Sequence, residues 1–389
     1  MTVYLDYNAT SPLCASAIQA MNDGMQWVGN PSSVHAYGRK SRQEIEQARQ
    51  DIANSLGVSS QRVIFTSGAT EANNMALAHF PGRVLVSAIE HDSVRFVRSD
   101  ALMIPVTNDG VVDLKALENL LAAPYDGPTL ISVMAAHNET GVIQPLADII
   151  PLAKQYKACV HSDCVQGVGR FYFPWETLNM LSLSAHKIGG PAGVGCLIIH
   201  PDWPLNAFLK GGGQERSLRP GTENMIGIMG MAAALRQNRH QDWSQTNRLR
   251  ITMEKALLTL SPDSNVIGQQ AIRLPNTTLI TMPGVKSETQ VMNFDLQGFA
   301  VSSGSACSSG KVRLSPSLQA MGVPKAEQET ALRISLSHVT SEAEIESFIQ
   351  AWSQIYERCS KRSHFEQDNN LVILTNIKRV DNHGAFNLT

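Results

Sequence analysis

Residues Leu130–Gly141 read LISVMAAHNETG, a short apolar run followed at once by a polar cluster. The run LISVM is typical of a parallel strand that is buried on both faces. Similar runs recur between about residue 60 and residue 200, and patterns typical of helices lie between several of them. Because strands that alternate with helices form βαβ units, the chain predicts an α/β fold with a mostly parallel central sheet.

Five of the expected strands are followed directly by polar side chains. The expected strands are Val63–Phe65, Arg83–Ser87, Leu130–Met134, Ala158–His161, Met180–Ser184 and Gly195–Ile199, and the helices expected between them are Thr70–Ala78, Leu114–Leu121 and Leu146–Tyr156. The polar clusters are Ser67–Asn74, Glu90 with His91, His137–Gly141, Ser162–Gln166 and Ala185–Lys187. Ligands bind at the carboxyl ends of parallel strands, so these five clusters predict one shared crevice.

A second, smaller α+β unit is expected after the first. A helical pattern follows the glycine-rich segment Lys210–Asn224 and continues to about Leu260, and turn-forming residues then mark a boundary. The elements expected beyond it are the strands Asn276–Thr281 and Ala331–Leu336 and the helices Glu288–Leu296 and Glu342–Tyr356. We therefore predict a large domain over residues 12–258 and a small domain formed by residues 1–11 and 259–389.

The composition is that of a compact globular enzyme. Of the 389 residues 43% are hydrophobic, and 32 Lys and Arg nearly balance 34 Asp and Glu. This balance gives no electrostatic reason to expect nucleic acid or a membrane surface as a partner. The six cysteines are scattered, and neither a secretory signal nor a long apolar run is evident. We therefore expect free thiols and a cytoplasmic location.

Three polar positions in the expected crevice each admit a chemical and an ordinary interpretation. Ser67–Thr70 precedes a helix, so it could bind a phosphate or simply cap that helix. Lys187 could form a Schiff base with a cofactor aldehyde, although most lysines are solvated surface residues. Asp163 could pair with a cationic pyridinium nitrogen, as in pyridoxal-phosphate (PLP) sites, or cap a helix. His161, Asp163 and Cys164 lack the spacing of a zinc site, so we expect no metal.

Cys307 stands in a stretch that is too polar and flexible to bury its thiol. The stretch Ser302–Gly310 reads SSGSACSSG. A mobile and accessible thiol suits a group that must enter a crevice, react and leave. The alternative is a plain surface loop whose cysteine has no role.

Together these segments resemble the NifS/IscS-type cysteine desulfurases, which are PLP enzymes of the class V aminotransferase-like group. The resemblance extends from Tyr4 to about Ile355. It rests on the motifs YLDYNAT, NPSSVHAYGR, FTSGATEANN, IEHDSV, NETGVIQP, SDCVQ, LSLSAHKIGGPAGVG, GGGQER, GTEN, SSGSACSSGK and LRISLS. It implies the PLP-dependent transferase fold of the aspartate aminotransferase type, also called fold type I, and a homodimer.

The resemblance also implies a role for each site residue. Lys187 would carry PLP as a Schiff base, and Cys307 would take the sulfur of L-cysteine as a persulfide, which leaves L-alanine. Asp163 would pair with the pyridinium nitrogen, and His91 would stack on the ring and relay a proton. Asn138 and Gln166 would contact the ring hydroxyl, and Ala69, Thr70, Ser184 and His186 would bind the phosphate. Thr222 would reach the phosphate of the neighbouring subunit, Arg333 would bind the substrate carboxylate, and Asn30 is a further substrate-site candidate.

Four positions depart from the family pattern: His137, Cys164, Pro220 and the pair Ser337-His338. The tail after about Lys361 does not resemble a scaffold-docking segment, so the sulfur acceptor stays open between an iron–sulfur scaffold and a tRNA-thiolation enzyme. A related PLP-dependent selenocysteine lyase, C–S lyase or kynureninase-like enzyme is one alternative. A non-catalytic binding subunit for sulfur-transfer proteins is another, although Lys187, Asp163 and Cys307 are all present.

Overall fold

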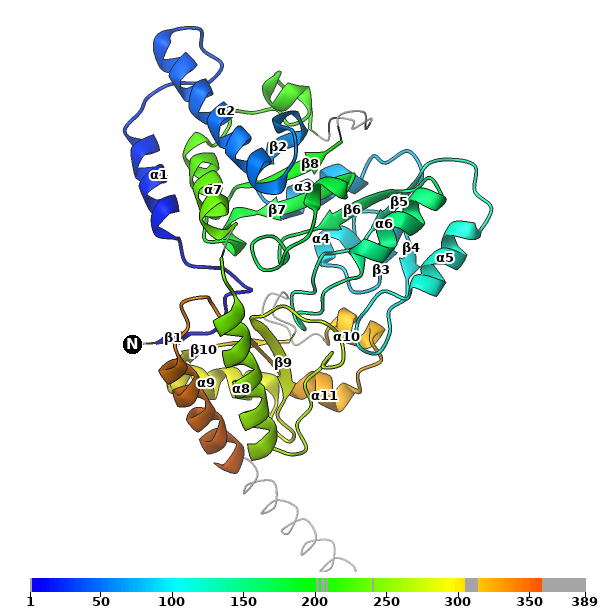
Figure 1. Cartoon of the computed structure of the whole chain (residues 1–389), viewed down its shortest axis with the longest axis vertical. Coiled ribbons are helices and arrows are strands. Elements are labelled where there is room, and N and C mark those ends of the chain that lie inside the picture. Colours follow the sequence, from blue (N-terminus) through cyan, green and yellow to red (C-terminus); the bar gives the residue numbers. More distant parts are fainter. Residues whose placement is uncertain are drawn as a thin grey trace, which may run out of the picture.

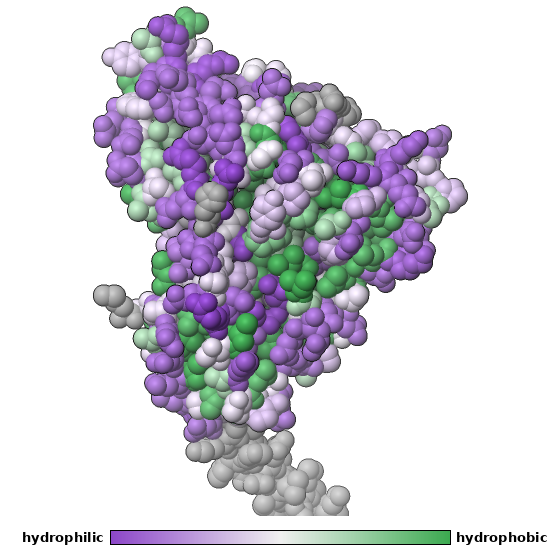
Figure 2. Space-filling view, in the orientation of Figure 1, coloured by the Kyte–Doolittle hydropathy of each residue, from purple (hydrophilic) through white to green (hydrophobic). Residues whose placement is uncertain are grey.

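The computed structural model describes residues 2–200, 203, 207, 209–239, 241–304 and 314–358. It contains a large unit built on a central sheet and a smaller unit beside it (Figure 1). Apolar surface gathers beside the junction of the two units on the face shown in Figure 2, whereas the side of α2 (Ala36–Leu56) seen there is mostly hydrophilic. None of the helices in the described ranges combines the length and apolar character that a membrane span needs.

The central sheet has seven strands and is parallel except at one strand. Its order is β2 (Val63–Thr66), β8 (Gly195–Ile199), β7 (Met180–Ser184), β6 (Cys159–Asp163), β5 (Thr129–Ser132), β3 (Arg83–Ser87) and β4 (Leu102–Ile104). β8 runs antiparallel to both of its neighbours, and every other pairing is parallel. The predicted mostly parallel sheet is confirmed. β4 is an edge strand that the sequence analysis missed, because LMI is too short to show a period.

Side chains on the strands alternate between two apolar cores, one on each face of the sheet. Val63 and Phe65 pack in one core, and Ile64 between them packs in the other. Helices α1 (Ala15–Met25), α2, α5 (Leu114–Ala122), α6 (Leu146–Gln155) and α7 (Met225–Asn238) contribute to the first core, and α3 (Ala69–Leu77) and α4 (Asp92–Arg95) contribute to the second. Each fully buried aliphatic side chain contributes about 1.5–3 kcal/mol, so covering both faces stabilises the sheet.

The smaller unit contains antiparallel strands covered by helices. Its strands are β11 (Ser302–Ser303), β12 (Ala331–Ser335) and β9 (Thr277–Thr281), and β1 (Val3–Tyr4) pairs separately with β10 (Phe299–Ala300). Its helices are α8 (Ser244–Leu260), α9 (Ser287–Leu296), α10 (Pro316–Ala320), α11 (Lys325–Thr330) and a helix over residues 342–358. Leu5 belongs to the same core as Phe294 and Trp352.

The boundary predicted at residue 258 is one helix too late. The single helical pattern expected up to about Leu260 is divided into α7 and α8. Leu249, Met253 and Leu257 of α8 pack in the core of the small unit. Apolar periodicity shows that a helix has a buried face, but it does not show which core receives that face.

Candidate active site

A cavity of about 500 Å³ lies at the carboxyl ends of β2, β3, β5, β6 and β7. Ten of the predicted cofactor and substrate residues line it: Ala69, Thr70, His91, Asn138, Asp163, Gln166, Ser184, His186, Lys187 and Arg333. The parallel strands bring their following loops to one edge of the sheet, which joins clusters that are far apart in the chain. The predicted shared crevice is therefore present.

One end of the cavity is formed by the start of α3. The helix begins after Gly68, and among the described residues no side chain caps it. The ordinary interpretation of this motif required Thr70 to cap α3. Thr70 lines the cavity instead and does not cap the helix. The first-turn N–H groups are thus not taken up by a capping side chain, and together with the positive end of the helix dipole they suit an anion such as a phosphate.

A glycine lets two strands approach closely behind this anion site. A Cβ built on Gly195 would lie 2.4 Å from the carbonyl oxygen of Leu183 and 2.7 Å from Cα of Gly68. Any side chain there would displace the backbone that leads into α3. Gly195 therefore keeps the start of α3 beside Ser184 of β7, another residue predicted to bind phosphate.

Asp163 ends β6 with its carboxylate at the cavity. The residue is 7% exposed, and its Oδ2 accepts a hydrogen bond from Asn73 Nδ2 at 2.8 Å. Its Oδ1 accepts one from the N–H of Val165 at 3.1 Å. A buried carboxylate is stabilised by a cationic partner, so Asp163 fits a protonated ring nitrogen.

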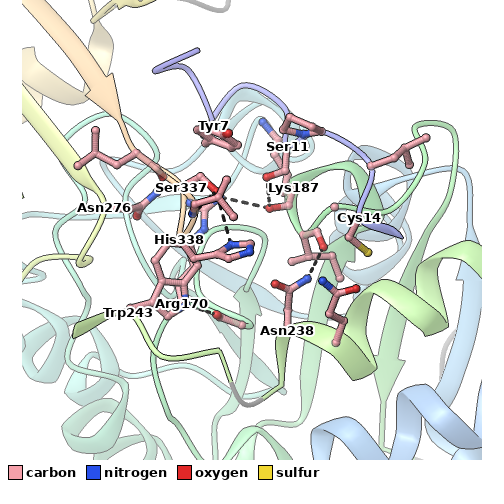
Figure 3. Close-up of a pocket in the computed structure, with 18 of the residues that line it drawn as sticks. Tyr7, Ser11, Cys14, Arg170, Lys187, Asn238, Trp243, Asn276, Ser337 and His338 are labelled. Carbon is pink, nitrogen blue, oxygen red and sulfur yellow. Dashed lines mark hydrogen bonds between the residues drawn. The ribbon is translucent and has the colours of Figure 1, made fainter. Parts of the chain in front are cut away.

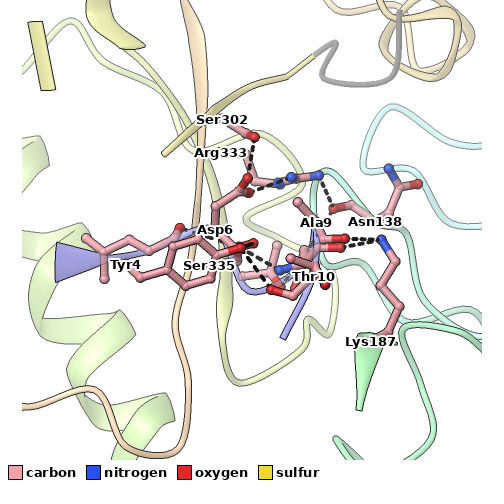
Figure 4. A network of polar contacts seen from close by, with 12 residues as sticks. Tyr4, Asp6, Ala9, Thr10, Asn138, Lys187, Ser302, Arg333 and Ser335 are labelled. Carbon is pink, nitrogen blue, oxygen red and sulfur yellow. Dashed lines mark hydrogen bonds and ion pairs between the residues drawn. The ribbon is translucent and has the colours of Figure 1, made fainter. Parts of the chain in front are cut away.

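The amine of Lys187 is held by the N-terminal segment. Nζ donates to the carbonyl oxygens of Asn8 at 2.7 Å and of Ala9 at 2.9 Å (Figure 4). Both of these residues also line the cavity. The lysine is therefore positioned by the fold and is not a solvated surface residue. Burial, and next to it the charge of Lys187, lowers the pKa of the neighbouring His186 to about 4.

His91 caps α4 with its own ring. Nδ1 accepts from the N–H of Ser93 at 3.1 Å and lies 2.8 Å from Ser93 Oγ. The ring is therefore fixed at the edge of the cavity by its own backbone turn. Gln166 is held as firmly, because its Nε2 donates to the carbonyl oxygen of Asn8 at 3.1 Å and its Oε1 accepts from Arg170.

Arg333 reaches the cavity from β12 of the small unit. It is 2% exposed, and its Nη2 pairs with Asp6 Oδ1 at 2.7 Å (Figure 4). Nη1 donates to the carbonyl oxygen of Asn138 at 3.3 Å, and Nε has no hydrogen-bond partner within the described residues. A guanidinium with buried donors to spare can bind a carboxylate in bidentate fashion.

The sequence analysis missed the part of the site that the N-terminus supplies. Asp6, Asn8 and Ala9 contact Arg333 or Lys187, although we assigned them no role. The signal was present in YLDYNAT, whose polar residues follow a two-residue strand. Their partners are more than 170 residues away, so no local pattern connects them.

Two predicted site residues lie outside this cavity, and a third is not among the residues that the structure describes. Asn30 lies exposed outside it and accepts a hydrogen bond from the N–H of Ser32 at 2.9 Å, and its role at the substrate site stays a prediction. Its side chain is used by a local turn, a role that its sequence motif does not reveal. Thr222 is also exposed and outside the cavity, and its role towards a neighbouring subunit stays a prediction. Cys307 lies outside the described residues.

A second, smaller cavity of about 260 Å³ shares Lys187 with the first and lies between the two units. Cys14, Trp243 and His338 are among its lining residues (Figure 3). The Ser337-His338 departure from the family pattern therefore borders this second cavity. It does not line the cavity that holds Asp163 and Arg333.

Two carboxyl groups beside the site have raised pKa values. Burial raises the pKa of Glu139 to about 7, with Asp92 adding to the effect and Ser315, Arg333 and His91 opposing it. Burial also raises the pKa of Glu90 well above its ordinary value, although the N–H of Met134 opposes the shift. Burial lowers the pKa of His137, one of the departures, to about 3.

Comparison with known proteins agrees with this geometry. A family model described as aminotransferase class-V matches residues 3–348. The chain belongs to the class V aminotransferase family. A cysteine desulfurase of Cereibacter sphaeroides is 36% identical over 381 residues, which cover 93% of this chain and 98% of that protein. An IscS-like cysteine desulfurase of Mycobacterium tuberculosis is 34% identical and covers 89% of this chain and 94% of its own.

A solved structure gives the same result as the sequence comparisons. A NifS-like protein from Rickettsia africae is 36% identical, with a TM-score of 0.85, and the match covers 92% of this chain and all of that one. These class V relatives are PLP-dependent. The cavity fits that cofactor, because it offers an anion site at α3, a buried carboxylate at Asp163 and an amine at Lys187.

Proposed function

We propose that this chain is a PLP-dependent cysteine desulfurase that converts L-cysteine to L-alanine and receives the sulfur as a persulfide on Cys307. The observation that carries the proposal is the composition of one cavity. It combines a helix N-terminus, a buried carboxylate, a lysine amine and a buried arginine with spare donors. The named activity of relatives that cover nearly the whole chain supports the same reaction.

The residues that would hold PLP are divided along the cavity. Ala69, Thr70, Ser184 and His186 would bind the phosphate, Asp163 the ring nitrogen, Asn138 and Gln166 the ring hydroxyl, and Lys187 the aldehyde carbon. His91 would cover the ring. When it is bound, PLP supplies an electron sink that stabilises negative charge on the substrate Cα.

The chain's own groups bind the substrate and move its protons. Arg333 binds the carboxylate of L-cysteine with the donors that Asp6 and Asn138 leave over. Nζ of Lys187 would accept the proton from Cα, and the buried carboxylate of Asp163 would stabilise positive charge on the ring nitrogen. His91 relays a proton for the sulfur step.

Sulfur transfer balances without an external oxidant. The Cys307 thiolate bonds to the substrate sulfur while the bond between Cβ and sulfur breaks, and the bonding electrons stay with carbon. A proton then completes the methyl group of alanine. One thiol and L-cysteine thus become one persulfide and L-alanine. Only the thiolate is an effective nucleophile, so a base near the cavity must accept the thiol proton.

We infer a homodimer in which each subunit completes the other's cavity. Exposed apolar side chains flank Asn30, with Val28 74% and Val34 88% exposed. A cleft lined by Pro31, Ser32 and residues 213–216 also places the Asn30 segment beside the segment that leads to Thr222. Asn30 and Thr222, the two described site residues outside the cavity, therefore lie on one side of the molecule, where a second copy would contact them.

Light scattering tests the dimer. The variant Val34→Asp is expected to shift the mass from two chains towards one, because a charge replaces an exposed apolar contact. Ile272→Asp, which changes a side chain that is 79% exposed at another site, is the control. An unchanged mass for Val34→Asp would place the interface elsewhere.

Mass spectrometry tests the reaction. After exposure to L-cysteine the Cys307 peptide is expected to gain one sulfur while alanine accumulates. The variant Cys307→Ser should form no persulfide and should keep the absorbance of bound PLP. Pyruvate in place of alanine would favour a C–S lyase, faster turnover of selenocysteine would favour a selenocysteine lyase, and protein that stays colourless with PLP would favour a non-catalytic binding subunit.

The downstream acceptor and the location belong to the same proposal. We expect a sulfur-acceptor protein, either an iron–sulfur scaffold or a tRNA-thiolation enzyme, in the cytoplasm. Transfer of labelled sulfur from the Cys307 persulfide to each purified acceptor distinguishes the two, and cell fractionation tests the location.

A further inference from the structure

A continuous chain of hydrogen bonds joins Asp163 to His91 along the cavity wall. Asn73 Nδ2 lies 2.8 Å from Asp163 Oδ2 and 2.9 Å from Ser93 Oγ. Ser93 Oγ lies 2.8 Å from His91 Nδ1. Asn73 is fully buried in α3, Ser93 belongs to α4, and Asp163 ends β6, so three separate elements form the chain.

The chemistry of the two ends gives this chain a direction. An ionised carboxylate only accepts hydrogen bonds, so Asn73 must turn its NH₂ group towards Asp163. The opposite amide orientation would place two oxygens against each other. The second amide hydrogen then reaches Ser93 Oγ, which leaves the hydroxyl hydrogen of Ser93 available for His91 Nδ1.

His91 Nδ1 is an acceptor of this hydrogen, because it also accepts from a backbone donor. The N–H of Ser93 donates to the same atom at 3.1 Å. A neutral imidazole that accepts at Nδ1 carries its proton on Nε2, because one ring nitrogen must be the donor. The backbone N–H and the hydroxyl of Ser93 thus hold the ring in one tautomer, and the hydroxyl is held in turn by Asn73 and Asp163.

We propose that Asn73 and Ser93 are positioning residues that hold His91 as the Nε2–H tautomer and couple its state to the carboxylate of Asp163. The significance of this coupling rests on the PLP-dependent function proposed above, in which Asp163 faces the ring nitrogen and His91 covers the ring. One carboxylate would then contact the ring nitrogen and also anchor the hydrogen-bond chain that ends at the residue over the ring.

NMR of the ring nitrogens tests the tautomer directly. The full chain with PLP is labelled with ¹⁵N-histidine, and His91 is identified among the 11 histidines by its loss in His91→Gln. We expect an acceptor-type shift at Nδ1 and a protonated shift at Nε2. A protonated Nδ1, in either the other neutral tautomer or the imidazolium, would overturn the proposal.

Variants test the coupling. Asn73→Ala is expected to shift the His91 nitrogens, to change the pH dependence of the bound PLP absorbance, and to lower kcat by about 10–100-fold with KM unchanged, since positioned acid–base groups supply about 10²–10⁴-fold. Asn74→Ala is the matched control, because that neighbouring amide donates to the carbonyl oxygen of Thr70. Identical spectra for Asn73→Ala and Asn74→Ala would overturn the coupling.

A second pair of variants covers the case in which Asn73→Ala does not fold. Ser93→Ala removes the hydroxyl, and Ser93→Thr restores it. We expect Ser93→Ala to shift the His91 nitrogens and Ser93→Thr to return them towards the wild-type values. If both variants show the wild-type pattern, the hydroxyl has no positioning role. If the wild type forms no persulfide while the tautomer is as expected, the proposed function fails and this inference stands.

Discussion

Arg333 is a buried residue whose guanidinium must serve several hydrogen-bond acceptors. Its guanidinium is buried, it joins the small unit to the carbonyl oxygen of Asn138 and to Asp6, and it must also bind substrate. Five N–H donors in one plane can serve three acceptors at once, whereas the three donors of an ammonium group spread from one point.

The variant Arg333→Lys should therefore keep the positive charge but bind the substrate more weakly. We expect KM for L-cysteine to rise by about 10–100-fold, which corresponds to the loss of one charge-assisted hydrogen bond worth about 1.5–3 kcal/mol. Steady-state kinetics measures this change. Arg98→Lys, in a partly exposed pair with Asp100, is the control. An unchanged KM would mean that another residue binds the carboxylate.

Among the elements, the turn η4 (Gln214–Ser217) has the most strained backbone. Glu215, Arg216 and Ser217 have φ values of 46°, 58° and 63°, a region that costs side chains other than glycine about 1–2 kcal/mol each. Glu215 offsets this cost, because both of its carboxylate oxygens bind Arg49, at 2.7 and 2.8 Å, and it accepts from the N–H of Phe65 at 2.8 Å.

The variant Glu215→Gln tests this anchor. Removing one partner of a buried ion pair leaves the other charge uncompensated, so we expect the free energy of unfolding to fall by about 3–5 kcal/mol. Chemical denaturation measures the change. Glu46 pairs with the same Arg49, but its side chain is 54% exposed, so Glu46→Gln should cost at most about 1 kcal/mol. Equal effects of the two variants would contradict the anchoring role.

At the scale of the whole molecule, residues 6–9 connect the two units around the cavity. Asp6 pairs with Arg333, Asn8 Nδ2 donates to the carbonyl oxygen of Asn138 at 3.2 Å and to Thr277 Oγ1 at 2.9 Å, and Asn8 and Ala9 hold Lys187. Glu139 lies at the same junction, near Ser315 and Arg333 of the small unit. The protonation state of Glu139 is therefore expected to depend on whether the junction is folded.

Glu139 should make stability depend on pH. Its pKa of about 7 in the folded protein exceeds its ordinary 4.5, so between these values the folded state binds the extra proton. Stability is then lost as pH rises through this window. The variant Glu139→Gln has no carboxyl group at this position, so it does not lose stability in this way as pH rises. We expect its advantage in the free energy of unfolding to grow from near zero at pH 4.5 to at most about 3 kcal/mol above pH 7.

Denaturation of both proteins across this pH range measures the advantage. The exposed residue Glu118, which pairs with Lys115, provides the control variant Glu118→Gln. A difference between Glu139→Gln and wild type that does not change with pH would show that folding does not raise the pKa of Glu139.

The sequence by itself determined the sheet and most of the cavity. Strands such as Arg83–Ser87, Met180–Ser184 and Gly195–Ile199 were predicted with their observed bounds, because short runs rich in apolar residues stand between the patterns typical of helices. The direction of parallel strands then requires the loops with Thr70, His91, Asn138, Asp163 and Lys187 to meet. Local composition and chain direction are enough for this part.

Only the tertiary structure decided which distant groups pair and which residues line the cavity of their own chain. Asn8 lies beside Lys187, Asn73 bridges Asp163 and Ser93, and α8 packs with the small unit. Asn30 and Thr222 lie outside the cavity of their own chain. Such contacts depend on how complete elements pack against one another, and no periodic pattern along the chain records the partner of a single side chain.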